Sequence, residues 1–260
     1  MTVLVDPPMW RAHGRLWAHL ASDTSLAELH GFAARVGIPR RSFEGDHYDI
    51  PQERYADVVA AGALEVSGGE LARRLRASGL RFRKRRGERP LARAVDGLAA
   101  AVPGSHVLEV VGSPHERRGA GAAVVLIRST EGHRMVLVRN ASRAGWGAPG
   151  GKREVDDGSV RAAAVREVAE EIGLRLEPGL LRPVGYQRVT IAPGEGRGTW
   201  DDGDNYVQAF GAVADPAQPL TPDRVEVLEA GWFTLAEASR LAGDAPWWPL
   251  VQWWWDQPAS

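Results

Sequence analysis

The first 80 residues alternate between short apolar runs, typical of strands, and longer segments with apolar positions at helical spacing. Helices are predicted from about Ser25 and from about Ser67, because each serine precedes a glutamate at the spacing of a capping box. The strand-like runs are residues 2–5, a segment leading into residues 46–51, and residues 63–66. This alternation predicts a small α/β domain over residues 1–80, with a mostly parallel sheet.

The pattern changes between residues 81 and 117. Residues 73–89 hold nine Arg or Lys against one Glu, and the apolar stripe that follows predicts a helix over residues 91–102, closed by Pro103-Gly104. We therefore assign residues 81–117 to a basic linker and helix that contains the domain boundary.

From residue 118 onward the chain is rich in strand-like runs. A turn joins two of these runs, residues 119–129 and 135–140, as in a hairpin or an adjacent strand pair. Further strands are expected near residues 187–191 and 206–212, on either side of an acidic, turn-rich loop, and Thr234 is placed to cap a later helix. These elements predict a second α/β domain over residues 118–260.

Composition describes a globular protein with enough apolar material for a core: 44% of the 260 residues are hydrophobic, 25% are charged, and the formal net charge is -1. The absence of cysteine excludes disulfides, thiol catalysis and thiolate metal sites. The N-terminus shows no signal-peptide pattern and no apolar run reaches 18 residues, so we expect a cytoplasmic protein without membrane association.

One segment raises a chemical question. The stretch REVAEEIG, residues 166–173, places Glu167, Glu170 and Glu171 on one helix face, where each like-charge pair costs roughly 0.2–0.5 kcal/mol. A helix from Ser159 to Gly173 is expected, with a buried stripe that directs the glutamates elsewhere: Val160, Ala164, Val168 and Ile172. A solvated acidic face is one interpretation. The other is a site for Mg²⁺ bound to phosphate oxygens, since Mg²⁺ prefers a few carboxylates beside substrate phosphates.

Residues 150–174 resemble the signature box of the Nudix hydrolases. The second half of the box is matched by Arg166, Glu167, Val168, Glu170, Glu171, Gly173 and Leu174. Gly151 is similar to the opening glycine, but its spacing to Arg166 is one residue too long. The first box glutamate falls on Gly158, with Asp157 beside it as a substitute that can pair with Arg166. The resemblance covers about residues 118–242 and implies an α/β/α sandwich with a mixed sheet.

The resemblance implies metal-dependent hydrolysis of an acid anhydride, the pyrophosphate bond of a nucleoside diphosphate linked to another moiety. It implies Mg²⁺, or Mn²⁺, held by Gly151, Glu167, Glu170 and Glu171, with Glu170 as ligand or general base. Arg166 is expected to orient Glu167. A bound metal ion neutralises developing charge and lowers the pKa of an attacking water, which fits this chemistry. A nucleotide-sensing or nucleic-acid-binding protein without turnover is the alternative, and the intact glutamate triplet favours the enzyme.

Residues outside the box complete the expected site. The acidic residues able to supply a further metal ligand are Asp201, Asp202, Asp204 and Glu226, and the sequence does not rank them. Arg139 and Arg143, on the approach to the box, are candidate contacts for substrate phosphates, with plain solvent exposure as the alternative.

The first 80 residues, through MTVLVDPP and DHYDIP, resemble an uncharacterised bacterial domain family sometimes fused to Nudix domains. In open parallel sheets, ligands bind at the carboxyl ends of strands. A metal or phosphate site is therefore a hypothesis for residues that follow the predicted strands: Asp6, His13, Asp46, His47 and Asp49. His19 and Asp23 are placed in the loop after the first strand, and residues 67–69 follow the third. Capping and turn formation are the alternative roles.

Two further features have a functional and a structural interpretation. The basic run 73–89 can bind nucleic acid electrostatically, although a solvated linker is favoured because it contains one aromatic residue and no nucleic-acid-binding motif. Five tryptophans crowd PWWPLVQWWWD near the C-terminus. They indicate packing against a neighbouring domain or a second subunit in a homo-oligomer, rather than base stacking.

Overall fold

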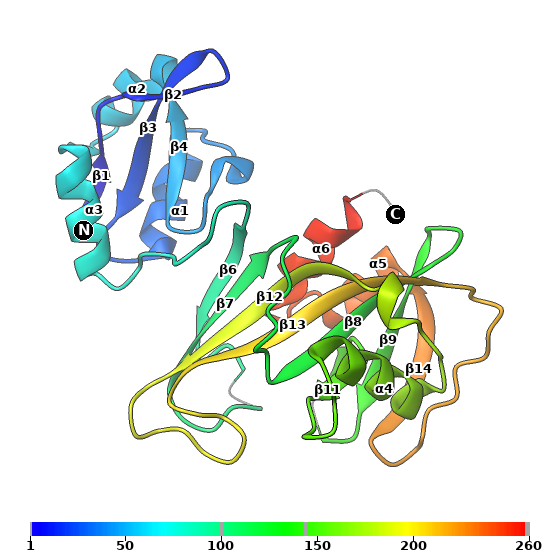
Figure 1. The fold of residues 1–260 in the computed structure, drawn as a ribbon. Coiled ribbons are helices and arrows are strands. Elements are labelled where there is room, and N and C mark those ends of the chain that lie inside the picture. Colours follow the sequence, from blue (N-terminus) through cyan, green and yellow to red (C-terminus); the bar gives the residue numbers. More distant parts are fainter. Residues whose placement is uncertain (1, 99–100, 143–144, 258–260) are drawn as a thin grey trace. The chain divides into compact units, whose positions relative to one another are not determined.

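The structure is a computed structural model that describes residues 2–98, 101–142 and 145–257. Its chain divides into two compact units, Met1–Arg85 and Arg86–Ser260. Each unit has its own sheet and helices (Figure 1), and each has its own hydrophobic core.

The first unit is a five-stranded sheet with helices on both faces. Its elements are β1 (Val3–Val5), β2 (Trp10–Ala12), β3 (Arg15–Ser22), α1 (Leu26–Arg35), β4 (His47–Pro51), α2 (Tyr55–Ala60), β5 (Leu64–Glu65) and α3 (Gly68–Ala77), with short 3₁₀ turns at Arg40–Ser42 and Gln52–Arg54. Side chains of β1 alternate between the faces: Val3 and Val5 pack in the core under α1, whereas Leu4 packs against Leu71 and Leu75 of α3. This arrangement confirms the small α/β domain.

The sheet of this unit is mixed and mostly antiparallel, which corrects the expected mostly parallel sheet. Among the described strands of this unit, only β1 and β5 pair in parallel, while β3 pairs antiparallel with β1, β2 and β4. The reason is a tight turn at His13 and Gly14, whose φ angles of 50° and 74° are both left-handed. The turn folds residues 10–22 into a hairpin, so His19 lies on a strand and not in a loop.

The second unit contains a nine-stranded mixed sheet. Its strands are β6 (Arg89–Val95), β7 (His106–Gly112), β8 (Ala122–Ser129), β9 (Arg134–Asn140), β10 (Trp146–Gly147), β11 (Gly150–Lys152), β12 (Arg182–Ile191), β13 (Gly203–Ala214) and β14 (Val227–Thr234). The main order is β10-β9-β8-β13-β12-β7-β6, with β11 on β8 and β14 on β9. The β8–β13 pair is parallel and the neighbouring pairs are antiparallel. The expected strands around residues 119–140, 187–191 and 206–212 are therefore confirmed.

Helices cover both faces of this sheet, as Figure 1 shows. They are α4 (Val160–Ile172), α5 (Leu235–Ala242) and α6 (Trp248–Trp255), and a 3₁₀ turn follows α4 at Pro178–Leu180. One core lies under α4 and contains its whole predicted stripe: Val160, Ala164, Val168 and Ile172. A second core lies under α5 and α6 on the opposite face. This is the expected α/β/α sandwich.

The helix predicted over residues 91–102 is wrong, because Arg89–Val95 forms strand β6 instead. The strand pairs antiparallel with β7 and shifts register between Pro90 and Ala92, where the proline cannot donate to the ladder. Asp96, with φ 50°, then turns the chain away. Strands β6 and β7, residues 89–95 and 106–112, thus belong to the second unit's sheet, and the expected basic linker and helix is not what residues 89–95 form.

The tryptophan-rich segment packs within its own unit. Trp248 and Trp254 of α6 are buried in the core under that helix. The guanidinium of Arg128 stacks 4.6 Å from the Trp254 ring centroid, and its N–H groups donate to the carbonyls at the end of α6. These contacts bury the two rings without a second subunit. None of the helices within the described ranges is long and apolar enough to cross a membrane.

Candidate functional site

Helix α4 places the box glutamates beside a glycine turn. Ser159 caps the start of the helix by accepting a hydrogen bond from Ala162 N, and Gly173 ends it with a left-handed φ of 71°, as predicted. Glu171 is only 4% exposed, and its Oε2 accepts a hydrogen bond of 2.7 Å from the backbone N–H of Gly150. A carboxylate on a buried helix face is therefore fixed against the turn that precedes the helix.

Glu167 lies against Gly151 on strand β11. A methyl group at Gly151 would stand 2.5 Å from the carboxylate of Glu167, so any larger residue there would displace this carboxylate. Burial raises the pKa of Glu167 above its ordinary value; the neighbouring Arg166 opposes this rise, while the charges of Glu170 and Glu226 add to it. A carboxylate in this setting gains from a nearby cation.

Arg166 connects α4 to the loop that precedes it through several hydrogen bonds. Its guanidinium donates to both carboxylate oxygens of Asp157, at 3.2 and 3.0 Å, to Glu170 at 2.8 Å, and to the carbonyl of Lys152 at 2.9 Å. It also lies 3.1 Å from Glu167. The hydrogen bond from Arg166 holds the pKa of Asp157 below its usual range, although burial acts in the opposite direction. Asp157 thus makes the arginine contact that the sequence assigned to it in place of the missing box glutamate.

The four acidic residues outside the box have different surroundings. Asp202 accepts the backbone N–H groups of Gly194 and Gly196, and these bonds lower its pKa and build the loop between β12 and β13. Asp204 accepts from the Thr190 hydroxyl. Asp201 is bonded within its own loop: its backbone carbonyl accepts from the Asn205 amide at 2.8 Å, and its backbone N–H donates to Asn205 Oδ1 at 3.1 Å. Glu226 is the one whose charge reaches Glu167. The influence of its charge on Glu167 therefore favours Glu226 among the residues that the sequence left unranked.

An apolar cavity of about 460 Å³ opens beside the glycine turn. Gly150, Gly151 and Lys152 form one side of it, and the rings of Trp200 and Trp247 form others. A smaller cavity of about 100 Å³ adjoins it, and Glu171 and Trp247 lie in the walls of that second space. Sequence reasoning missed both rings as cavity walls. In the sequence, Trp200 is an isolated tryptophan in an acidic loop, and Trp247 belongs to the tryptophan-rich segment near the C-terminus.

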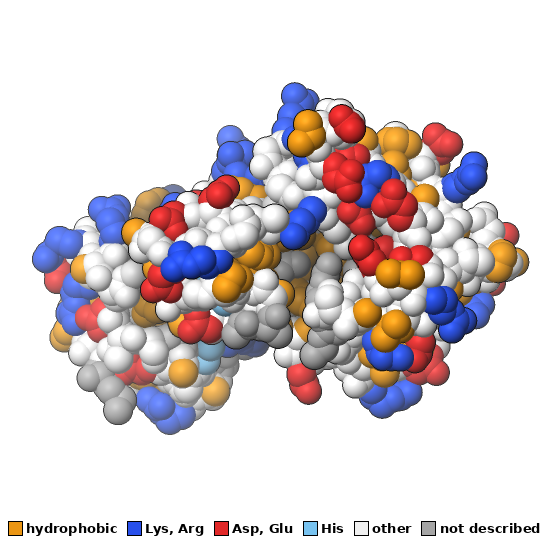
Figure 2. All heavy atoms as spheres, turned by 90° about the horizontal axis from the view of Figure 1, so that it is seen from below, with side chains coloured by type: hydrophobic (Ala, Val, Ile, Leu, Met, Phe, Trp, Pro, Cys, Tyr) orange, Lys and Arg blue, Asp and Glu red, His pale blue; other side chains and the backbone are white. Residues whose placement is uncertain are grey.

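Acidic side chains gather on the face of the second unit shown in Figure 2. Arg139, expected to contact substrate phosphates, forms an ion pair with Glu229 across β9 and β14 on the exposed surface. Arg143 lies outside the described residues.

The basic run 73–89 is partly folded onto the first unit: Phe82 is buried, Lys84 pairs with Glu44, and Arg81 lies 3.6 Å from Asp46.

In the first unit, the structure brings together most of the proposed N-terminal site. His19 contacts Asp6, and His47 contacts both Asp46 and Asp49. Burial lowers the pKa of His47, but hydrogen bonds and charge from the two carboxylates outweigh it and raise the value to about 9. Gly68, at the start of α3, lies so close that a methyl group there would stand 3.2 Å from Asp6.

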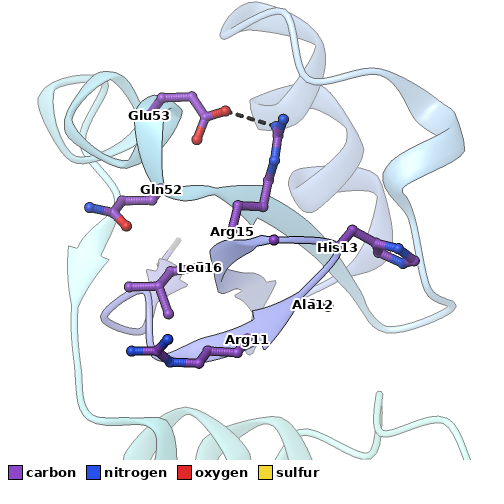
Figure 3. A pocket seen from close by; sticks show the side chains of 8 residues that line it. Arg11, Ala12, His13, Arg15, Leu16, Gln52 and Glu53 are labelled. Carbon is purple, nitrogen blue, oxygen red and sulfur yellow. Dashed lines mark hydrogen bonds and ion pairs between the residues drawn. The ribbon is translucent and has the colours of Figure 1, made fainter.

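Two of the proposed N-terminal residues lie elsewhere. His13 stands at the turn between β2 and β3, where Figure 3 shows it projecting away from the Arg15–Glu53 ion pair beside a surface hollow. Asp23 pairs with Arg74 of α3. The inclusion of His13 in this site is therefore corrected: the turn that reverses the chain carries its side chain away, and His19 takes its place.

Comparison with known protein families shows which family the chain belongs to. Residues 117–254 match the NUDIX domain, and the chain belongs to that family. Residues 3–78 match a second family, described as a protein of unknown function, DUF4031. Among curated proteins, sequence comparison finds no match.

Several solved structures resemble part of the chain. A MutT/nudix family protein from Enterococcus faecalis is 18% identical with a TM-score of 0.35; the match covers 46% of this chain and 46% of that one. MutT from a study of Aliivibrio salmonicida and Vibrio cholerae is 18% identical over 52% of this chain and 95% of its own, with a TM-score of 0.39. A C. elegans Ap4A hydrolase is 18% identical over 51% and 93%, with a TM-score of 0.39.

Proposed function

We propose that residues 86–260 hydrolyse the pyrophosphate bond of a nucleoside diphosphate linked to another moiety, with Mg²⁺ or Mn²⁺ as cofactor. The observation that carries the proposal is the placement of Glu167 and Glu171 against the Gly150–Gly151 turn, beside an apolar cavity, with Glu170 on the same helix. The donors are carboxylate and carbonyl oxygens, the hard ligands that Mg²⁺ prefers. The residues present therefore fit a divalent metal ion such as Mg²⁺.

Each residue has a distinct task in this proposal. Glu167 and Glu171 hold the metal with the carbonyl of Gly151, and Glu226 is the acidic residue from outside the box. Arg166 positions Glu167 through the contacts that it makes to Asp157 and Lys152. When bound, the metal neutralises charge on the pyrophosphate and lowers the pKa of the attacking water.

Glu170 is the most exposed of the triplet, with 60% of its side chain accessible. It is therefore the one able to exchange partners, either as a further ligand or as the base that takes the proton from water. Its 2.8 Å ion pair with Arg166 is a contact that a metal ion or a water molecule could replace.

In this proposal, the apolar cavity beside the box binds the nucleoside. Trp200 and Trp247 offer aromatic faces, and base stacking on such faces is worth about 1–3 kcal/mol per base. Lys152, at the exposed edge of the same cavity, carries a positive charge at the point where a diphosphate would pass toward the glutamates. A nucleotide with its base in the cavity thus directs its phosphates toward α4.

The proposal is tested by an activity screen on the full chain with nucleoside triphosphates, dinucleotides and nucleotide sugars. Each reaction is run with Mg²⁺, with Mn²⁺ and with chelator, and released nucleoside monophosphate and phosphate are measured. We expect hydrolysis of at least one class, lost on chelation. Binding of a nucleotide without turnover under any metal would instead establish the sensing alternative and overturn the hydrolase.

A further inference from the structure

Two histidines of the first unit share an unusual arrangement. His19 on β3 and His47 on β4 lie on neighbouring strands, with ring centroids 5.0 Å apart and nearly perpendicular planes. Each ring uses Nδ1 to contact a carboxylate: Asp6 at 2.9 Å for His19 and Asp46 at 2.5 Å for His47. Because a carboxylate only accepts, Nδ1 carries a proton in both rings, and Nε2 is the nitrogen that remains to meet a metal ion.

Both supporting carboxylates are buried and held in place. The side chains of Asp6 and Asp46 are 4% and 3% exposed. Asp6 also accepts the backbone N–H of His19 at 2.5 Å, and Asp46 accepts that of Phe82 at 2.5 Å. A carboxylate that fixes Nδ1–H is the usual support of a histidine that binds a metal through Nε2, because it sets the tautomer and makes the ring more basic.

A third donor completes the arrangement. Asp49, two residues beyond His47 on β4, lies with one oxygen 3.4 Å from Nε2 of His47. Two ligands about 2.1 Å from a tetrahedral metal ion are about 3.4 Å apart, which is the same separation. One ligand atom from each of His19, His47 and Asp49 lies within 4.8 Å of the other two, so small side-chain rotations suffice to enclose an ion.

We propose that His19, His47 and Asp49 bind a divalent transition metal of the Zn²⁺ class, with Asp6 and Asp46 as positioning residues. Imidazole nitrogen favours Zn²⁺ and its neighbours over Mg²⁺ and Ca²⁺, which distinguishes this site from the all-oxygen box of the second unit. The proposal is therefore independent of the proposed hydrolase activity.

Three protein ligands leave a coordination position open, as in zinc sites that bind water or a substrate group rather than purely structural ones. The exposure of the ligands agrees with an accessible ion: 24% of the His19 side chain, 13% of His47 and 39% of Asp49 can contact solvent. The site thus fits a metal that meets a small ligand from solution.

The local charge also favours a cation. Asp6, Asp46 and Asp49 bring three carboxylates to one place, where the nearby cations are Arg81, 3.6 Å from Asp46, and Lys84, whose charge acts on Asp49. A divalent ion held by His19, His47 and Asp49 would add positive charge among these three carboxylates and would take the place of the proton on His47.

The test uses the full chain, stripped with chelator and loaded with one equivalent of Zn²⁺, and reads the ligands by X-ray absorption at the zinc edge. We carry it out in the Glu171→Gln background, which weakens the oxygen site of the second unit. The expected spectrum contains about two imidazole nitrogens. A spectrum with oxygen neighbours alone overturns the proposal, and this outcome does not depend on the folding of any ligand variant.

Affinity measurements with Zn²⁺ supply the matched controls. His19→Gln and His47→Gln should each weaken binding at least tenfold, and Asp6→Asn about 10- to 100-fold through the orientation of His19. His13→Asn is the control, since it removes a histidine of the same unit that lies at the β2–β3 turn. Asparagine tolerates the left-handed backbone of that position. Equal affinity in His47→Gln and His13→Asn would show that the cluster is only an ion-pair network.

Discussion

Asp157→Asn tests the link between the glycine turn and the glutamate helix. In the structure, Asp157 accepts two hydrogen bonds from Arg166 and one of 2.8 Å from the backbone N–H of Glu154. Asparagine keeps the shape of the side chain but has one oxygen in place of two. In either orientation its NH₂ group faces an N–H of the Arg166 guanidinium, so at least one of these contacts becomes repulsive.

The magnitude follows from what Arg166 retains. A hydrogen bond to a charged group contributes about 1.5–3 kcal/mol, and Arg166 keeps its contacts to Glu170 and to the carbonyl of Lys152. We therefore expect the free energy of unfolding of the second unit to fall by about 1–3 kcal/mol. Residues that orient metal ligands typically change metal affinity or activity about 10- to 100-fold, and we expect turnover to fall within that range.

The control is Asp156→Asn, which removes the same charge from the adjacent exposed residue. Both proteins are compared by urea unfolding, followed by tryptophan fluorescence that comes mainly from the second unit, and by turnover at saturating Mg²⁺. If Asp157→Asn matches Asp156→Asn in both measurements, Asp157 does not serve as the partner of the box arginine and the reasoning fails.

Three further predictions follow from single positions. Gly151→Ala places a methyl group 2.5 Å from the Glu167 carboxylate and should lower Mg²⁺ affinity at least tenfold in titrations; unchanged affinity would contradict the assigned contact. Trp247→Ala should raise KM about tenfold with a smaller effect on kcat, because stacking contributes to binding; an unchanged KM would remove the base from this cavity. Burial, aided by Arg40, lowers the pKa of His30 to about 4 from 6.5. The unfolded chain therefore binds a proton first, and stability is lost as pH falls from 6.5 to 4; His30→Gln should flatten that loss in urea unfolding, and an identical pH profile would refute it.

Local signals allowed correct prediction of α4. Its N-cap, its left-handed C-cap and its buried stripe all lie within fifteen residues, so neighbouring side chains decide them. The same spacing rule failed at β6, where Leu91, Val95 and Leu98 match a helical period. Pairing with β7 decided that segment, and pairing is not visible in the spacing of apolar residues.

The N-terminal sheet shows the same limit. Strand–helix alternation predicted parallel pairing, but one turn at His13 and Gly14 inserted a hairpin and reversed β3 against β1. That reversal carries His19 to Asp6 and His47, contacts between residues far apart in the sequence. The sequence singled out the right residue types, whereas the grouping required the register of three strands.

At the box, sequence spacing predicted the glutamate triplet and pointed to Asp157 beside the extra residue. It did not rank Glu226, because the chain reaches the box from a loop more than fifty residues away. The cavity walls Trp200 and Trp247 come from two other distant segments. Chemistry that lies within one helix is readable from the sequence, and chemistry assembled from several loops is not.

The central claim is that the α4 glutamates hold a catalytic metal, and Glu171→Gln tests it most directly. Glutamine keeps an oxygen to accept the Gly150 N–H but loses the charge that the metal requires. The measurement is metal-dependent hydrolysis at saturating substrate, beside Glu177→Gln as an exposed control and metal-free thermal melts of both proteins. We predict a fall in turnover of at least about 100-fold in Glu171→Gln alone, since metal activation carries most of the chemistry, with metal-free stability retained. Turnover by Glu171→Gln at the rate of the Glu177→Gln control would contradict the account.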